Sequence, residues 1–311
     1  MIDRYYQRFK NTIYSRTEEG KLQKKIKSKG LLEKDFELLD LNEIYLHRFN
    51  LKILLTTHQF VIDGFNLMVK IQDNLHANFA IDANGLLISF DNFRFLTRTK
   101  EELFIINEIF VDGVYNFDCQ MPVIVIDIGM NVGFASIFFA AKPVVTKVYA
   151  FEPFPETFDQ ALLNIVLNPN QFEKILPLNI GLSDGKRADT WEYCPEWKGH
   201  CGLNSLPPKI RGSSVVQEVT VQLENAGEIL NKIVQENPNT DIVLKIDCEG
   251  SEYAILETIF KAKSFSNVKI IMLEWHKHGE KKILEKLITE NFKSLTFNRN
   301  IHTVGMIYGF R

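Results

Sequence analysis

Hydrophobic and polar positions along residues 121–153 follow one another in the order of a strand, a turn, a helix and a second strand. Residues 123–126 are continuously apolar, which is typical of a parallel strand buried on both faces. An apolar helix is predicted over residues 134–141, and a second strand over residues 147–151. Such an α/β unit is the kind that binds a nucleoside at the ends of its strands.

The turn after the first strand contains the polar residues of this unit. Asp127 ends the strand, and Gly129, Asn131 and Gly133 complete the pattern D-x-G-x-x-x-G. A dinucleotide fold has a second glycine where Asn131 stands, because the backbone must approach a pyrophosphate there. S-adenosylmethionine has no phosphate and carries an ammonium and a sulfonium, so Asp127 favours it over a nicotinamide or flavin cofactor. Glu152 ends the second strand, within reach of ribose hydroxyls.

Apolar runs farther along the chain predict the rest of a parallel sheet. Ser183 and Asp184 follow a third strand predicted at residues 175–180. Ligands collect at the carboxyl ends of parallel strands, so these two residues are candidates for contact with adenine, with a plain polar turn as the alternative. Residues 185–215 have little periodicity and predict a loop. We expect this loop to bind the acceptor, which is the substrate that receives a group from the cofactor. The remaining strands are expected at 241–246, 268–273, 293–297 and 303–308, the last two antiparallel.

The N-terminal part of the chain has a different pattern of polar and apolar residues. Its first forty residues are polar and helix-prone, and a short, β-rich pattern follows over residues 45–96, with a hairpin turn at Asn84-Gly85. Thr99 and Glu102 form a capping box that begins a helix. We therefore predict an extension over residues 1–98, placed as a lid or wall over the cofactor turn, and a catalytic domain over residues 99–311.

Composition narrows the classes of partner. The 311 residues are 45% hydrophobic and 24% charged, with a net charge of −3, and lack the basic excess of a nucleic-acid binder. The N-terminus has no apolar run typical of a signal peptide, and no transmembrane segment is predicted, so we expect a cytoplasmic protein. The four cysteines show no C-x-x-C spacing, which favours reduced thiols.

Candidate catalytic residues follow the fourth and fifth strands. Where the nucleophile of a reaction is weak, a positioned base contributes about 10² to 10⁴ in rate. His276 and Asp247 are the candidates for this base, because both lie at the strand ends. If Asp247, Glu274 and His276 converge, they could instead hold a divalent metal ion. Lys245, in the same strand as Asp247, is expected to pair with a carboxylate.

Acidic residues also begin the helix that follows the fourth strand. Glu249 and Glu252 lie in its predicted first turn, where carboxylates interact favourably with the helix dipole. Capping is therefore the role expected for these two residues.

These motifs together resemble the FkbM family of S-adenosylmethionine-dependent methyltransferases. The resemblance covers about residues 108–274 and rests on the strings EIFVDGVY, VIDIGMNVGFAS, VYAFEP, LSD and LKIDCEGSEYAIL. The last string is the most specific, since D-x-G-x-x-x-G occurs in many methyltransferases. Two parts depart from the family: VQLENAGEILNKI replaces the usual Thr-Leu-Asp, and the extension before Glu108 lies outside the match.

The resemblance implies the class I methyltransferase fold, an α/β, Rossmann-like sheet of seven strands whose last strand is antiparallel. It also implies O-methylation of a hydroxyl on a sugar, glycan precursor or natural product, as in polysaccharide biosynthesis. The cofactor contacts that it implies lie at Asp127, Gly129, Asn131, Gly133, Glu152 and Asp184.

Two other functions fit the same sequence. The first is an NAD-linked sugar oxidoreductase, and the second is a catalytically silent adaptor that binds a partner through the N-terminal extension. The intact pair of Asp127 and Glu152 favours an enzyme over the adaptor. The expected acceptor is a small molecule or glycan and not a nucleic acid, while its identity, the use of a metal and the oligomeric state stay open.

Overall fold

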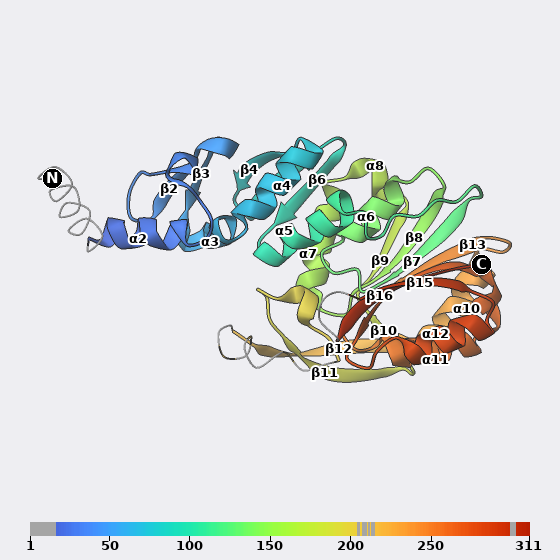
Figure 1. Ribbon diagram of the computed structural model, residues 1–311. Helices are drawn as coiled ribbons and strands as arrows, with labels where there is room; N and C mark the ends of the chain where they lie inside the picture. Colours follow the sequence, from blue (N-terminus) through green and yellow to red (C-terminus); the bar gives the residue numbers. More distant parts are fainter. Residues whose placement is uncertain (1–16, 204–205, 207–209, 211, 213–214, 299–302) are drawn as a thin grey trace, which may run out of the picture. The chain divides into compact units, whose positions relative to one another are not determined.

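The computed structural model describes residues 17–203, 206, 210, 212, 215–298 and 303–311. The chain divides into two compact units, Met1–Asp112 and Gly113–Arg311 (Figure 1). The boundary that the sequence suggested, between residues 98 and 99, falls inside the first unit. No helix in the described ranges is long and apolar enough to cross a membrane.

The first unit combines two small antiparallel sheets with helices. The hairpin predicted at Asn84-Gly85 is confirmed, since Asp82 pairs with Gly85 across the turn. The prediction of a β-rich segment is wrong for residues 55–75, which are helical, because their buried apolar residues recur at helical spacing. The elements are α2 (Glu18–Lys27), η1 (Glu33–Asp35), β1 (Phe36–Leu38), β2 (Glu43–Leu46), η2 (His47–Phe49), β3 (Leu51–Leu54), α3 (Leu55–Asp63), α4 (Phe65–Leu75), β4 (Asn78–Asp82), β5 (Gly85–Phe90), β6 (Phe93–Thr97), α5 (Lys100–Ile106) and the π-helix η3 (Asn107–Val111).

Thr99 caps α5 as predicted, but the returning bond of the capping box reaches Arg98 and not Thr99 itself. Thr99 Oγ1 accepts the backbone N–H of Glu102 at 3.2 Å, and the Glu102 carboxylate accepts the N–H of Arg98 at 2.6 Å. The helix belongs to the first unit, and Phe110 of η3, just beyond it, packs against aromatic rings of β5 and β6. Its ring centroid lies 5.1 Å from that of Phe90 and 5.1 Å from that of Phe93.

A seven-stranded sheet forms the centre of the second unit. Its order is β15-β16-β14-β13-β7-β8-β9, in which β16 is antiparallel to both neighbours and the other pairs are parallel. This arrangement confirms the predicted α/β, class I methyltransferase fold with an antiparallel last strand. The strands are β7 (Val123–Ile128), β8 (Val145–Phe151), β9 (Ile175–Leu178), β13 (Asp241–Ile246), β14 (Val268–His276), β15 (Lys293–Asn298) and β16 (Val304–Phe310).

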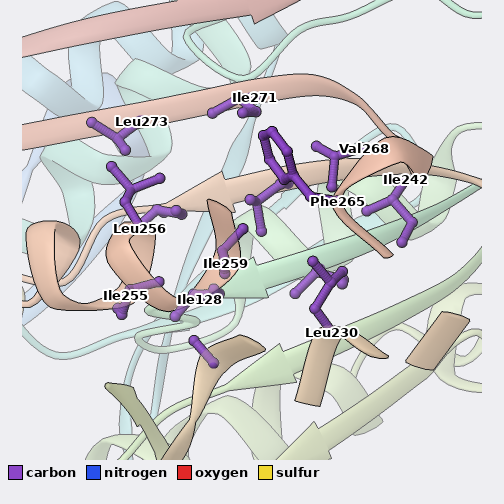
Figure 2. Packing of buried hydrophobic residues seen from close by; sticks show 14 of the residues in the cluster. Ile128, Leu230, Ile242, Ile255, Leu256, Ile259, Phe265, Val268, Ile271 and Leu273 are labelled. Carbon is purple, nitrogen blue, oxygen red and sulfur yellow. The ribbon is translucent and has the colours of Figure 1, made fainter. Parts of the chain in front are cut away.

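Helices enclose the sheet and bury an apolar core. Figure 2 shows Leu230, Ile255, Leu256 and Ile259 packing beside strand residues such as Leu273. Fully burying one such side chain contributes about 1.5–3 kcal/mol. The helices are α6 (Phe134–Ala141), α7 (Pro155–Val166), α8 (Pro169–Phe172), η4 (Lys198–His200), α10 (Ala226–Glu236), α11 (Glu252–Lys261), η5 (Lys263–Asn267) and α12 (Lys281–Thr289).

A separate three-stranded sheet follows β9. It consists of β10 (Gly181–Ser183), β12 (Gln217–Asn225) and β11 (Arg187–Tyr193), in that order. The predicted loop over residues 185–215 is therefore wrong for β11, where Trp191 and Tyr193 alternate with a polar residue and turn inward. Part of that predicted loop, including residues 207–209, lies outside the described residues.

The ends of β7 and β13 approach each other closely at Gly129. This residue has a φ of +84°, and a Cβ placed on it would lie 1.8 Å from the carbonyl oxygen of Asp247. Only glycine fits such a contact, because any side chain would overlap backbone atoms of the neighbouring strand end. Gly129 thus sets how near the two strand ends can come.

We predict that Gly129→Ala lowers the free energy of unfolding more than Gly279→Ala does. Gly279 has a similar φ of +76° but nothing within 4 Å of the Cβ position. Alanine at either site therefore costs about 1–2 kcal/mol of backbone strain, and only Gly129→Ala adds the overlap with Asp247. Denaturant titrations of both variants measure the difference, and equal losses would contradict this packing.

Candidate active site

Four neighbouring parallel strands, β8, β7, β13 and β14, end at one edge of the sheet. The polar residues at these ends include Glu152, Asp127, Asp247 and His276. Strand register sets Asp127 of β7 opposite Lys245 of β13. The sheet thus brings together four residues that the sequence selected one at a time.

Asp127 and Lys245 form a buried ion pair. Asp127 Oδ1 lies 3.1 Å from Lys245 Nζ, with the Asp127 side chain 0% exposed, and Asp127 Oδ2 accepts the Ser136 hydroxyl at 2.6 Å. Burial lowers the pKa of Lys245, but the carboxylates of Asp127 and Asp247 outweigh it and raise that pKa to about 12. The predicted pairing of Lys245 with a carboxylate is confirmed.

The role expected for Asp127, contact with the ammonium of the cofactor, stays a prediction. Its carboxylate already has Ser136 and Lys245 as partners and no exposed surface. The contacts instead give Asp127 a structural task, which is to neutralise Lys245 inside the protein.

Glu152 fixes the turn after β7. Its Oε2 accepts the N–H of Asn131 at 2.9 Å, and its Oε1 accepts the N–H of Phe154 at 3.0 Å. Burial raises the pKa of Glu152 to about 7, against the opposing effect of these two N–H groups. Asn131 and Gly133 have φ of +52° and +89°, so the turn keeps a conformation that this carboxylate supports.

Tyr115 holds Asp247. Sequence reasoning assigned it no role, although it is the last residue of the string EIFVDGVY on which the resemblance rests. Its hydroxyl donates to Asp247 Oδ2 at 3.0 Å, and Lys245 Nζ lies 5.4 Å from its ring centroid. Burial raises the pKa of Tyr115 well above its usual value, and the carboxylates of Asp247, Glu274 and Asp127 add to this. The Asp247 side chain remains 28% exposed.

His276 lies between two carboxylates. Its Nδ1 is 2.8 Å from Glu252 Oε1, and its Nε2 is 3.3 Å from Glu249 Oε1. Burial lowers the pKa of His276, but these partners outweigh it and raise that pKa to about 11. His276 is therefore an imidazolium at neutral pH, and it links the end of β14 to the turn after β13.

Glu252 organises that turn, beyond the capping role that the sequence suggested. Its buried carboxylate accepts the N–H of Cys248 at 3.2 Å and the N–H of Gly250 at 2.9 Å, as well as contacting His276. We call His276, Glu249 and Glu252 the imidazolium clamp.

The metal site proposed from Asp247, Glu274 and His276 is not supported by the structure. His276 pairs with Glu249 and Glu252, whereas Asp247 contacts Tyr115. Within the described ranges, no group of three or more His, Cys, Asp or Glu side chains is arranged to hold a metal ion.

Ser183 and Asp184 lie at the end of β10, in the small sheet. The Asp184 carboxylate accepts Arg187 Nη1 at 2.7 Å and the Ser183 hydroxyl at 3.1 Å. The hydrogen bond from Arg187 lowers the pKa of Asp184. Contact of these residues with adenine stays a prediction.

Several known methyltransferases are similar to this chain in sequence or in fold. Methyltransferase sdnD of Sordaria araneosa is 26% identical over 237 residues, which are 68% of this chain and 90% of that protein. Hexuronic acid methyltransferase AglP of Haloferax volcanii is 28% identical over 165 residues, which are 53% of this chain and 60% of that protein. The crystal structure of methyltransferase FkbM from Methylobacillus flagellatus is 12% identical, with a TM-score of 0.42 over 80% of this chain and 60% of that one.

The family model described as the methyltransferase FkbM domain matches residues 127–297. The match begins at the carboxylate of the buried ion pair and includes the ends of β8, β13 and β14. It covers more than half of the 311 residues, so the chain belongs to the FkbM methyltransferase family.

Proposed function

We propose that this protein transfers a methyl group from S-adenosylmethionine to a hydroxyl of a sugar, glycan precursor or natural product. The observation that carries the proposal is the negative charge at the strand ends, where the carboxylates of Asp127 and Asp247 lie 3.1 and 3.9 Å from the ammonium of Lys245. Such an excess of negative charge favours a cationic sulfonium and disfavours a pyrophosphate. The name of the relative AglP, a hexuronic acid methyltransferase, supports a sugar as the acceptor.

The residues of the turn after β7 fit the proposed cofactor. Each oxygen of the Glu152 carboxylate accepts one backbone N–H, and each keeps a second lone pair for a ribose hydroxyl. The Cβ positions of Gly129 and Gly133 face Asp247 and Ala161 of the protein, so these glycines set the path of the turn itself. When bound, S-adenosylmethionine supplies a methyl group that its sulfonium has already activated.

Asp247 is the group best suited to take the proton that the acceptor hydroxyl loses. It is partly exposed, and the Tyr115 hydroxyl holds one of its carboxylate oxygens. His276, the other candidate, cannot accept a proton while it is an imidazolium, because both ring nitrogens then carry one. We therefore assign the base to Asp247 and the positioning of the turn after β13 to the imidazolium clamp.

Calorimetry with S-adenosylhomocysteine and NAD tests the cofactor. We expect the wild-type protein to bind S-adenosylhomocysteine and not NAD. The Glu152→Gln variant should bind S-adenosylhomocysteine about 10- to 100-fold more weakly, because a hydrogen bond to a charged group contributes about 1.5–3 kcal/mol. Affinity of the wild type should rise as the pH passes upward through about 7, because ionisation of Glu152 adds acceptor strength. Tight binding of NAD instead would support the oxidoreductase.

A transfer assay tests the reaction. Radiolabelled methyl donor is supplied with nucleotide sugars and cell-surface glycan fragments, with and without divalent ions. Label should appear in at least one saccharide, whereas cofactor binding without transfer to any acceptor would favour the silent adaptor.

We predict that Asp247→Asn lowers kcat by about 10²- to 10⁴-fold, the usual contribution of a positioned base. The fold should persist, because Lys245 keeps Asp127 as its buried partner. Affinity for S-adenosylhomocysteine is the control and should change little. Tyr115→Phe removes only the hydroxyl that holds Asp247 and should lower kcat less than Asp247→Asn does. An unchanged kcat in Asp247→Asn would show that Asp247 is not the base.

We predict that His276 makes stability fall as the pH rises. Its pKa is raised from 6.5 to about 11 in the folded protein, so its stabilising contribution is complete below about pH 6.5 and is lost progressively towards pH 11. Denaturant titrations at several pH values from 7 to 10 should show a smaller loss in His276→Gln than in the wild type. His278→Gln, outside the clamp, is the matched control, and identical slopes in wild type and His276→Gln would contradict the clamp.

A further inference from the structure

Trp197 differs from the other tryptophans of the chain in its exposure. Its relative exposure is 38%, compared with 8% for Trp191 and 3% for Trp275. A single exposed apolar side chain is common on protein surfaces and needs no function. Its surroundings decide whether this ring has one.

The backbone around Trp197 is held in place by several contacts. The N–H of Trp197 donates to the carbonyl of Cys194 at 3.0 Å, and its own carbonyl accepts from Cys201 Sγ at 3.2 Å. The His200 ring meets the indole edge-on at 5.3 Å, and Lys198 donates to Gln160 of α7. An aromatic ring on such a fixed backbone can bind a ligand with little loss of conformational freedom.

The same loop contacts the turn that contains the proposed base. A Cβ built on Gly202 would lie 2.7 Å from the Cβ of Glu249 and 2.9 Å from the carbonyl oxygen of Cys248. The absence of a side chain at Gly202 therefore lets the loop lie directly against this turn. Asp247 comes immediately before Cys248, so Trp197 belongs to a loop that borders the proposed methyl-transfer site.

Glu249 provides a second, independent observation. Its φ is +49°, a left-handed conformation that is uncommon for a non-glycine residue and occurs often at functional sites. His276 Nε2 holds its carboxylate at 3.3 Å, yet the side chain remains 21% exposed. A fixed and accessible carboxylate keeps lone pairs that can accept hydroxyl groups.

We propose that Trp197 and Glu249 form the acceptor subsite and bind a pyranose ring. A pyranose has an apolar face of C–H groups that can lie on an indole, and hydroxyls at its rim that can donate to a carboxylate. This inference rests on the proposed function and assigns its acceptor to the sugars. An aromatic natural product would use the indole and have less need of Glu249.

Binding of defined saccharides tests the subsite without requiring turnover. The probes are the methyl glycosides of glucose, glucuronic acid and N-acetylglucosamine, with catechol as a hydroxylated aromatic for contrast, measured by ligand-observed NMR. We expect at least one glycoside to bind the wild-type protein and Trp197→Ala to raise its Kd about 5- to 10-fold. Trp197→Phe should restore most of the affinity, and Glu249→Gln should weaken binding of the same glycoside.

Matched variants separate the subsite from general surface effects. Phe172→Ala removes an exposed aromatic ring of α8 and should leave saccharide affinity unchanged. Gly202→Ala should weaken saccharide binding by displacing the loop, whereas Gly185→Ala, with nothing within 4 Å of its Cβ position, should not. Affinity for S-adenosylhomocysteine should be the same in Trp197→Ala, Phe172→Ala and Gly185→Ala as in the wild type.

Equal saccharide affinity in wild type and Trp197→Ala would overturn the subsite. So would binding of catechol alone, or of no glycoside at all. In each of these cases, retained binding of S-adenosylhomocysteine would leave the proposed cofactor intact and remove only the acceptor subsite. Loss of S-adenosylhomocysteine binding in the wild type would instead overturn the proposed function itself.

Discussion

The buried pair of Asp127 and Lys245 is the interaction on which the site geometry depends. Removing one partner of such a pair costs about 3–5 kcal/mol, because the other charge stays buried without compensation. The pair joins β7 to β13 where both strands end, and Lys245 also donates to the carbonyl of Gly129. Gly129 in turn touches the carbonyl of Asp247. The position of the proposed base is thus tied to an ion pair in the protein interior.

The two aspartates of this edge differ because of their surroundings. Asp127 is fully buried with an ammonium and a hydroxyl as partners, whereas Asp247 is partly exposed and held by Tyr115. A buried carboxylate with such partners stabilises the strand ends, and an accessible one can exchange a proton with a ligand. Both positions hold an aspartate, so the residue type alone does not show which of the two has which role.

The sheet was predictable from the sequence because parallel strands buried on both faces are continuously apolar, as in β7. Strand β11 was missed even though Trp191 and Tyr193 alternate with a polar residue, since aperiodic flanks obscured that short signal. Residues 55–75 were misassigned because β-branched composition competed with helical spacing. At the site, the pairing of Lys245 followed from its strand, but the bond from Tyr115 to Asp247 spans 132 positions in sequence and has no local pattern.

The clamp at His276 explains why titration range is a weak guide to a base. A free histidine titrates near neutrality, but the carboxylates of Glu249 and Glu252 keep this one protonated far above that range. The turn after β13 is held by the clamp and is also contacted by Gly202 of the Trp197 loop, in both cases at Glu249. The ion pair and the Glu152 turn lie at the ends of β7, β8 and β13, whereas Trp197 lies in the loop that follows β11. Substitutions in the loop could therefore change which acceptor the protein binds while leaving the proposed cofactor site unchanged. One fold can host different substrates in this way.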